Sequence, residues 1–181
     1  SVEDKVREAV RRAKEALKKL VEDDRRVVKE VEEMLDTLLD KNRDSVRRAK
    51  EKLEDLKRKG LDDDTVRKLL EDLKRLLDRN EEEVRRLKEE IRRENKKNEE
   101  VVERLEREVK KLLDELERDK VPESDAERLI ETLERLVKEL EDHVRRSIRK
   151  LRELVEEMRD HSRRSDEELK KRLKEVEDRV R

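Results

Sequence analysis

Apolar residues recur along nearly the whole chain at the spacing of one face of an α-helix. Over positions 2–56 the apolar stripe has one member about every 3.6 residues, which is the period of a straight α-helix and not of a strongly supercoiled one. Similar stripes cover positions 66–116 and 126–180. The pattern predicts three long, nearly straight helices, each on the order of 90 Å in length at 1.5 Å per residue.

The first break in the stripe lies at residues 59–62. Gly60 suits the left-handed position that ends many helices, and Leu61 is placed to make the apolar contact that accompanies such an end. Asp62 can then cap the next helix, as Ser1 can cap the first one. These residues predict a tight turn near 60–62.

The second break lies near residues 120–123. Pro122 cannot continue a helix, and Ser124 with Glu127 has the spacing of a capping box. We therefore expect helices over about residues 2–59, 63–119 and 124–180, with turns near 60–62 and 120–123.

Turns this short place consecutive helices antiparallel to one another. The narrow stripe on each helix is enough for a core shared by three helices. The fold class that we predict is therefore all-α: a single-chain antiparallel three-helix bundle with helices of about 58–60 residues. We expect residues 1–181 to form a single domain.

The composition supports helices and excludes several function classes. Charged residues make up 60 % of the chain and hydrophobic residues 30 %, a profile that is typical of long charged helices when the apolar residues keep a helical period. With 54 basic and 55 acidic residues and no aromatic residue, nucleic acid is not an expected partner. No apolar run approaches the roughly 20 residues of a membrane span, and we expect no targeting signal. We expect a soluble protein of unknown location, cytoplasmic if produced recombinantly.

Polar residues interrupt the stripe in each predicted helix, and they do so in pairs 18 residues apart. Eighteen residues make five turns of an ideal helix, so both members of a pair share one face, about 27 Å apart along the axis. The pairs are Asp24 with Asn42, Asn80 with Asn98, His143 with His161, and Ser147 with Ser165.

Aligning the antiparallel helices by height collects these side chains into two buried polar layers. We expect the first layer to contain Asp24, Asn95, Asn98, His143 and Ser147. We expect the second layer to contain Asn42, Ser45, Asn80, His161 and Ser165. An unpaired buried polar group costs about 1–3 kcal/mol, whereas Asn, His and Ser can satisfy one another. Such layers penalise a slipped pairing, so we predict that they specify helix register and pairing.

Together these features resemble de novo designed helical bundles that carry buried hydrogen-bond networks. The resemblance rests on the regular helical period, the glycine turn, the absent aromatics, the mixed charges and the polar layers at five-turn spacing, and it covers the whole chain. It implies a coiled-coil-like structural scaffold, often hyperstable, with no natural biochemical activity and no required partner.

The polar layers also raise the question of chemistry. Asp24, His143 and Ser147 are the residue types of a hydrolytic triad. No glycine-rich turn or free helix N-terminus lies nearby to form an oxyanion hole, and Asn42 replaces the acid in the second layer. One histidine and at most one carboxylate in each layer are fewer than the ligands of a stable zinc site. We expect no enzyme activity, no metal and no cofactor.

The alternative function is an interaction module. Adjacent apolar pairs such as Val27-Val28 and Leu38-Leu39 widen the stripe. This width is compatible either with the edges of a three-helix core or with a face that accepts a partner helix or a second copy of the chain. An oligomer or a designed partner helix therefore stays open.

The two histidines add a pH response to this alternative, since histidine is the side chain that titrates near neutral pH. A neutral His161 buried among Asn and Ser would stabilise the fold at high pH, and acidification would remove that contribution. His143 would respond in the opposite sense, because a neighbouring Asp24 carboxylate favours the charged ring.

Overall fold

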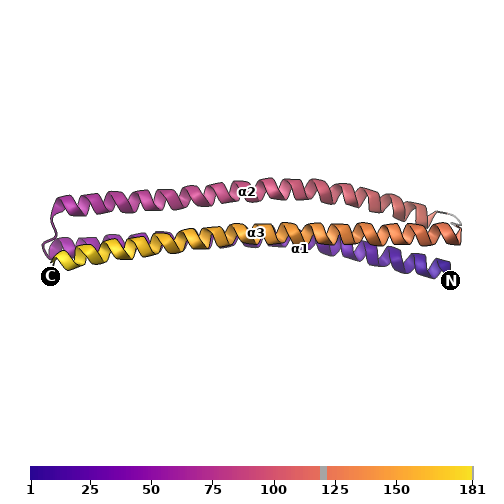
Figure 1. Cartoon of the computed structure of the whole chain (residues 1–181), viewed down its shortest axis with the longest axis horizontal. Coiled ribbons are helices and arrows are strands. Elements are labelled where there is room, and N and C mark those ends of the chain that lie inside the picture. Colours follow the sequence, from indigo (N-terminus) through magenta and orange to yellow (C-terminus); the bar gives the residue numbers. More distant parts are fainter. Residues whose placement is uncertain (119–121, 181) are drawn as a thin grey trace. The chain divides into compact units, whose positions relative to one another are not determined.

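The computed structural model describes residues 1–118 and 122–180 of the chain. These residues form three helices and no strand: α1 (Val2–Arg58), α2 (Asp63–Glu117) and α3 (Glu123–Val180) (Figure 1). All three pairs of helices pack against each other, which confirms the predicted all-α three-helix bundle. The helices have 57, 55 and 58 residues, so α1 and α2 are slightly shorter than expected.

The turn after α1 has the glycine-dependent geometry that the sequence predicts. Gly60 adopts a φ of 111°, which favours glycine, and its N–H donates to the carbonyl oxygen of Lys57 at 3.2 Å. The N–H of Leu61 donates to the carbonyl oxygen of Leu56 at 2.9 Å. This pair of bonds is a Schellman motif, and the buried side chains of Leu56 and Leu61 lie in one apolar cluster.

Side chains cap the first two helices at the predicted positions. Asp62 Oδ2 accepts a hydrogen bond from the backbone N–H of Thr65 at 3.0 Å, and its Oδ1 accepts one from Thr65 Oγ1 at 2.7 Å. These hydrogen bonds lower the pKa of the Asp62 carboxyl. Ser1 Oγ accepts a bond from the N–H of Asp4 at 3.3 Å. Both caps satisfy backbone donors that have no partner within the helix.

The start of α3 differs from the prediction. The helix begins at Glu123, and the N–H of Ala126 already donates to the carbonyl oxygen of Pro122 at 2.9 Å. Ser124 therefore lies inside the first turn and not at the cap, so the capping-box prediction is wrong. Pro122 is the residue before the helix, and its carbonyl oxygen accepts the first helical hydrogen bond. Of the expected second turn, Lys120 and Val121 lie outside the described residues, as does residue 119, the expected end of the second helix.

Contacts divide the chain into two compact units, and each unit contains a segment of all three helices. Unit 1 consists of Ser1–Glu30 and Ile91–Leu151, and unit 2 consists of Val31–Glu90 and Arg152–Arg181. One predicted polar layer falls in each unit. That residues 1–181 behave as a single domain stays a prediction.

In unit 1, ion pairs and hydrogen bonds define the direction of the helices. Lys14 Nζ lies 3.3 Å from Glu117 Oε1, whereas Asp24, ten residues further along α1, bonds to Asn98, further back along α2. These two segments are therefore antiparallel. One buried apolar cluster of the unit consists of Val10, Ala13, Leu17, Val102, Leu105, Val109, Leu113, Leu116, Leu133, Leu136, Leu140 and Val144.

Unit 2 has the same antiparallel relation between its segments of α2 and α3. Arg172 Nη1 lies 2.5 Å from Asp72 Oδ2, while Ser165, earlier in α3, bonds to Asn80, later in α2. One buried apolar cluster of this unit consists of Val46, Ala49, Leu53, Leu56, Leu61, Val66, Leu73, Leu76, Leu169 and Val176.

The apolar doublets of α1 show which member enters the core. Val27 and Leu39 are buried, whereas their neighbours Val28 and Leu38 are half-buried. The buried positions 24, 27, 31, 35, 39 and 42 keep spacings of three or four residues, as a single helix face requires. The half-buried member of each doublet, Val28 or Leu38, therefore covers the edge of the core.

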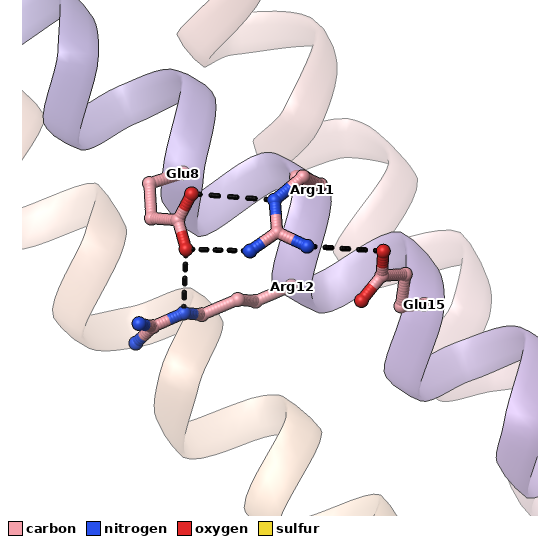
Figure 2. A network of polar contacts seen from close by, with 4 residues as sticks. All are labelled: Glu8, Arg11, Arg12 and Glu15. Carbon is pink, nitrogen blue, oxygen red and sulfur yellow. Dashed lines mark hydrogen bonds and ion pairs between the residues drawn. The ribbon is translucent and has the colours of Figure 1, made fainter.

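The outward faces carry ion pairs between successive turns of the same helix. Figure 2 shows one such network on α1, in which the Arg11 guanidinium donates to Glu8 Oε1 at 2.6 Å and to Glu15 Oε1 at 3.0 Å. Arg12 Nε also donates to Glu8 Oε1, at 2.9 Å. The hydrogen bond from Arg11 is the main cause of the lowered pKa of the Glu8 carboxyl. These exposed pairs favour helix formation at i,i+3 and i,i+4 spacing and need no binding role to explain them.

Candidate functional site

In the core of unit 1, a hydrogen bond between two buried side chains joins Asp24 on α1 to Asn98 on α2. Asn98 Nδ2 donates to Asp24 Oδ1 at 2.6 Å. Asp24 is only 6 % exposed and Asn98 only 1 %. A hydrogen bond between two helices inside an apolar core ties them at one register, because any slip breaks the bond and strands both groups.

Helix α3 brings two further members of the first layer to this level. Lys150 Nζ lies 3.0 Å from Glu94 Oε2, so the antiparallel register places the level of Asn98 between His143 and Ser147. Ser147 is buried and His143 is half-buried. Ser147 Oγ and His143 Nε2 are buried atoms without a hydrogen-bond partner among the residues that the structure describes.

Asn95 is the one predicted member of this layer whose hydrogen bond leads away from it. Its Nδ2 donates to Glu99 Oε1 at 3.3 Å, along the exposed side of α2, and the side chain is only half-buried. Asn95 precedes Asn98 by three residues, which is close to one helical turn but rotates the side chain toward the edge of the core. The structure therefore places Asn95 at the rim of the layer.

The electrostatics of the first layer disfavour charge on both titratable members. Burial raises the pKa of Asp24, and the negative Glu99 adds to the effect, whereas the hydrogen bond from Asn98 and the charge of Arg25 partly oppose it. A carboxyl group so placed costs free energy when it is ionised.

His143 shifts in the direction opposite to the prediction. Burial and the positive charge of Arg146 lower the pKa of His143, Arg104 adds to this, and Glu94 opposes it. The expectation that Asp24 favours the charged ring is therefore wrong. The carboxylate of Asp24 is directed to Asn98, and desolvation together with two arginines outweighs the attraction of the one acidic group, Glu94.

This arrangement differs from a hydrolytic triad in its hydrogen bonds. In a triad the acid accepts from the histidine, which in turn bonds the nucleophile. Here Asp24 accepts from Asn98. His143 Nε2 and Ser147 Oγ have no partner within residues 1–118 and 122–180. The three residue types share a layer without forming the bonded chain.

The second layer places two almost fully buried amides at one level of unit 2. Asn42 on α1 is 1 % exposed and Asn80 on α2 is 0 % exposed. Their neighbours Arg43 and Glu81 form an ion pair at 3.5 Å, which aligns the two helices at this height. Ser165 Oγ on α3 donates to Asn80 Oδ1 at 3.3 Å. Unit 2 thus also has a polar contact between helices, here between α2 and α3.

Several polar atoms of the second layer have no partner among the described residues. They are Asn42 Nδ2, Asn42 Oδ1, Asn80 Nδ2 and His161 Nε2. His161 and Ser45 are half-buried. His161 lies near Glu83, since it contributes to the lowered pKa of that carboxyl after the larger effect of the hydrogen bond from Arg86. The structure therefore joins Ser165 directly to Asn80, places Asn42 at the level of Asn80, and leaves His161 and Ser45 half-buried.

Sequence reasoning missed one buried polar residue, Ser162. It directly follows His161, as the buried Val144 follows His143 in the first layer. The chain repeats the pattern of His, one residue, two arginines and Ser at 143–147 and at 161–165. The apolar residue Val144 in the first copy is the signal that position 162 in the second copy also faces the core.

Asn42→Leu is expected to raise the free energy of unfolding by about 1–2 kcal/mol, because the amide is buried and neither of its polar atoms is hydrogen-bonded to any described residue. Urea unfolding followed by circular dichroism measures the change. Asn80→Leu is the control: it removes an amide that accepts from Ser165, so its gain should be smaller. A loss of stability in Asn42→Leu would show that this amide is hydrogen-bonded in solution.

Comparison of the chain with protein-family models, with curated proteins and with solved structures finds no match. Within the described ranges 1–118 and 122–180, no group of three or more His, Cys, Asp and Glu side chains is placed to hold a metal ion. The described helices also contain no segment that is long and apolar enough to cross a membrane.

Proposed function

We propose that the chain is a designed structural scaffold whose buried polar layers specify helix register and pairing. The observation that carries the proposal is the bond from Asn98 to Asp24, which joins two helices inside an apolar core. The second unit supports it with the bond from Ser165 to Asn80. A designed origin is supported by the resemblance to designed bundles and by the five-turn repeat of the layers.

The physical argument is a comparison of the native register with a slipped one. If α2 moved by one turn against α1 in unit 1, Asp24 would face Val102 in place of Asn98. Both partners of the hydrogen bond would then be buried without a partner, at a cost of about 1–3 kcal/mol each. Leu and Val layers alone discriminate poorly between registers, because one aliphatic side chain replaces another at little cost.

The test replaces the layer members of both units with Leu or Val and measures oligomeric state by size exclusion with light scattering. The parent chain is expected to run as one species of 22.1 kDa. The all-apolar variant is expected to be at least as stable, since the replaced groups contribute little net stability, but to populate several oligomers.

The control variant replaces only Asn95 and Ser45 with Leu or Val; both side chains are half-buried. It adds apolar surface without removing a buried polar contact, so it should run as the parent does. If the all-apolar variant remains as uniform as the parent, the register function is excluded.

A groove in unit 1 favours a second candidate, an interaction module. The groove lies between α1 and α3, and its lining combines apolar side chains with charged ones: Ala9, Ala13, Ala16, Leu133 and Val137 with Arg12, Glu134, Lys138 and Glu141. Small alanine side chains allow another helix to approach closely, so a partner helix or a second copy of the chain would fit this face. A defined dimer of the parent chain in light scattering would favour this candidate over the scaffold.

A further inference from the structure

Only one of the two polar atoms of the Asn98 amide is hydrogen-bonded to a described residue. Its Nδ2 donates to Asp24 Oδ1, while its Oδ1 is buried and accepts no hydrogen bond from any described residue. An ionised carboxylate has no proton to offer, so it cannot satisfy that oxygen. A neutral carboxylic acid can, because it carries both an acceptor and a donor and thus matches the acceptor and donor of a primary amide.

The side chains around Asp24 come from all three helices. On α1, Arg25 favours the charged carboxylate; on α2, Glu99 disfavours it. On α3, the titratable side chain at this level is His143, and the charges that act on it are Arg146, Glu94 and Arg104. Burial and the negative charge of Glu99 raise the pKa of Asp24, and the positive charge of Arg25 offsets this rise only in part.

We infer that Asp24 is a proton-binding site: unit 1 takes up a proton from solvent at Asp24 Oδ2, and the neutral acid donates it in a hydrogen bond to Asn98 Oδ1. The bond from Asn98 Nδ2 to Asp24 Oδ1 is kept, so two reciprocal hydrogen bonds then join α1 to α2. This inference goes beyond the register function and does not depend on a designed origin. Protonation of Asp24 therefore strengthens the contact between α1 and α2 in mild acid.

The sign of the pH dependence follows from the direction of the pKa shift. The pKa of Asp24 is raised above its ordinary value of 3.8. As the pH falls through the folded value toward 3.8, the folded chain binds a proton that the unfolded chain does not, and acidification therefore stabilises the fold. His143 acts in the opposite sense, since its lowered pKa makes acidification below 6.5 unfavourable to the fold.

The direct test is a carboxyl ¹³C NMR titration of the full chain. The Asp24 resonance should titrate at a higher pH than the resonances of exposed aspartates. A midpoint at or below theirs would overturn the inference.

A variant separates Asp24 from all other titrating groups. Asp24→Asn carries a donor and an acceptor at every pH, so its urea midpoint should exceed that of the parent at pH 7, and the gap should close toward pH 4. The control is Asp40→Asn, which removes an exposed carboxylate that pairs with Arg43 at 3.3 Å. The difference in urea midpoint between Asp40→Asn and the parent should not shrink toward pH 4 as it does for Asp24→Asn. A gap for Asp24→Asn that stays constant with pH would also overturn the inference, whatever the oligomeric state of the layer variants.

Discussion

Leu140→Ala is expected to lower the free energy of unfolding by about 2–5 kcal/mol. Leu140 is 0 % exposed and lies in the apolar cluster of unit 1. The loss has two parts, the transfer of the removed methyl groups and the cavity that close-packed neighbours cannot fill. Urea unfolding followed by circular dichroism measures it.

The same variant tests whether the chain is one cooperative domain. If it is, Leu140→Ala in unit 1 and Leu53→Ala in unit 2 should each lower the midpoint of one shared transition. Hydrogen exchange should then lose protection in both units in either variant. Met34→Ala is the control, because this side chain is 42 % exposed and its truncation should change stability by only about 0.5 kcal/mol. Full protection of unit 2 in Leu140→Ala would show two independently unfolding units.

The fold class could be predicted from the sequence because a single pattern, the helical period of the apolar residues, dominates the chain. A 3.6-residue apolar period over tens of residues has no alternative reading as a strand, and Gly60 interrupts it at the place where a left-handed residue is needed. The cap at Asp62 followed for the same reason, since its geometry depends only on residues within one turn. Local rules therefore predicted local structure.

The details that could not be predicted from the sequence depend on contacts with residues of other helices. Val27 and Val28 have the same chemistry, and packing against the other helices decides which one is buried. Ser124 satisfied a local capping rule, but the chain begins α3 one residue earlier, after Pro122. For His143, counting acidic residues at one height was insufficient, because desolvation and the arginines outweigh attraction by a carboxylate.

The two layers also differ in their hydrogen bonds, although their members repeat at the same five-turn spacing. Asp24 and Asn42 occupy equivalent positions of the repeat. Asp24 is bonded to the amide of Asn98 on α2, whereas Asn42 is bonded to none of the described residues. Equal spacing fixes the face on which a side chain lies, but the hydrogen bond depends on the direction of its polar atoms. The layers should therefore respond differently to the same substitution.

Asn98→Leu is expected to lower the free energy of unfolding by about 2–3 kcal/mol at pH 7, because it removes the hydrogen bond to a buried carboxylate. Leucine branches at Cγ as asparagine does, so the change replaces both polar atoms with methyl groups at nearly the same positions. Asp24 would then be left buried, ionised and without the donor that now lies 2.6 Å away. Urea unfolding of the variant and the parent under the same conditions gives the loss.

Asn42→Leu is the matched control, since it makes the same change in the other layer, at an amide with no hydrogen bond among the described residues, and should stabilise the chain. Opposite signs for the two variants would show that the bond to Asp24, and not the polarity of the layer in general, couples the helices. At pH 4 the loss in Asn98→Leu should shrink, because a protonated Asp24 is cheaper to leave without a partner than a charged one. Equal stabilisation by both substitutions would mean that the bond to Asp24 contributes nothing beyond its cost of burial.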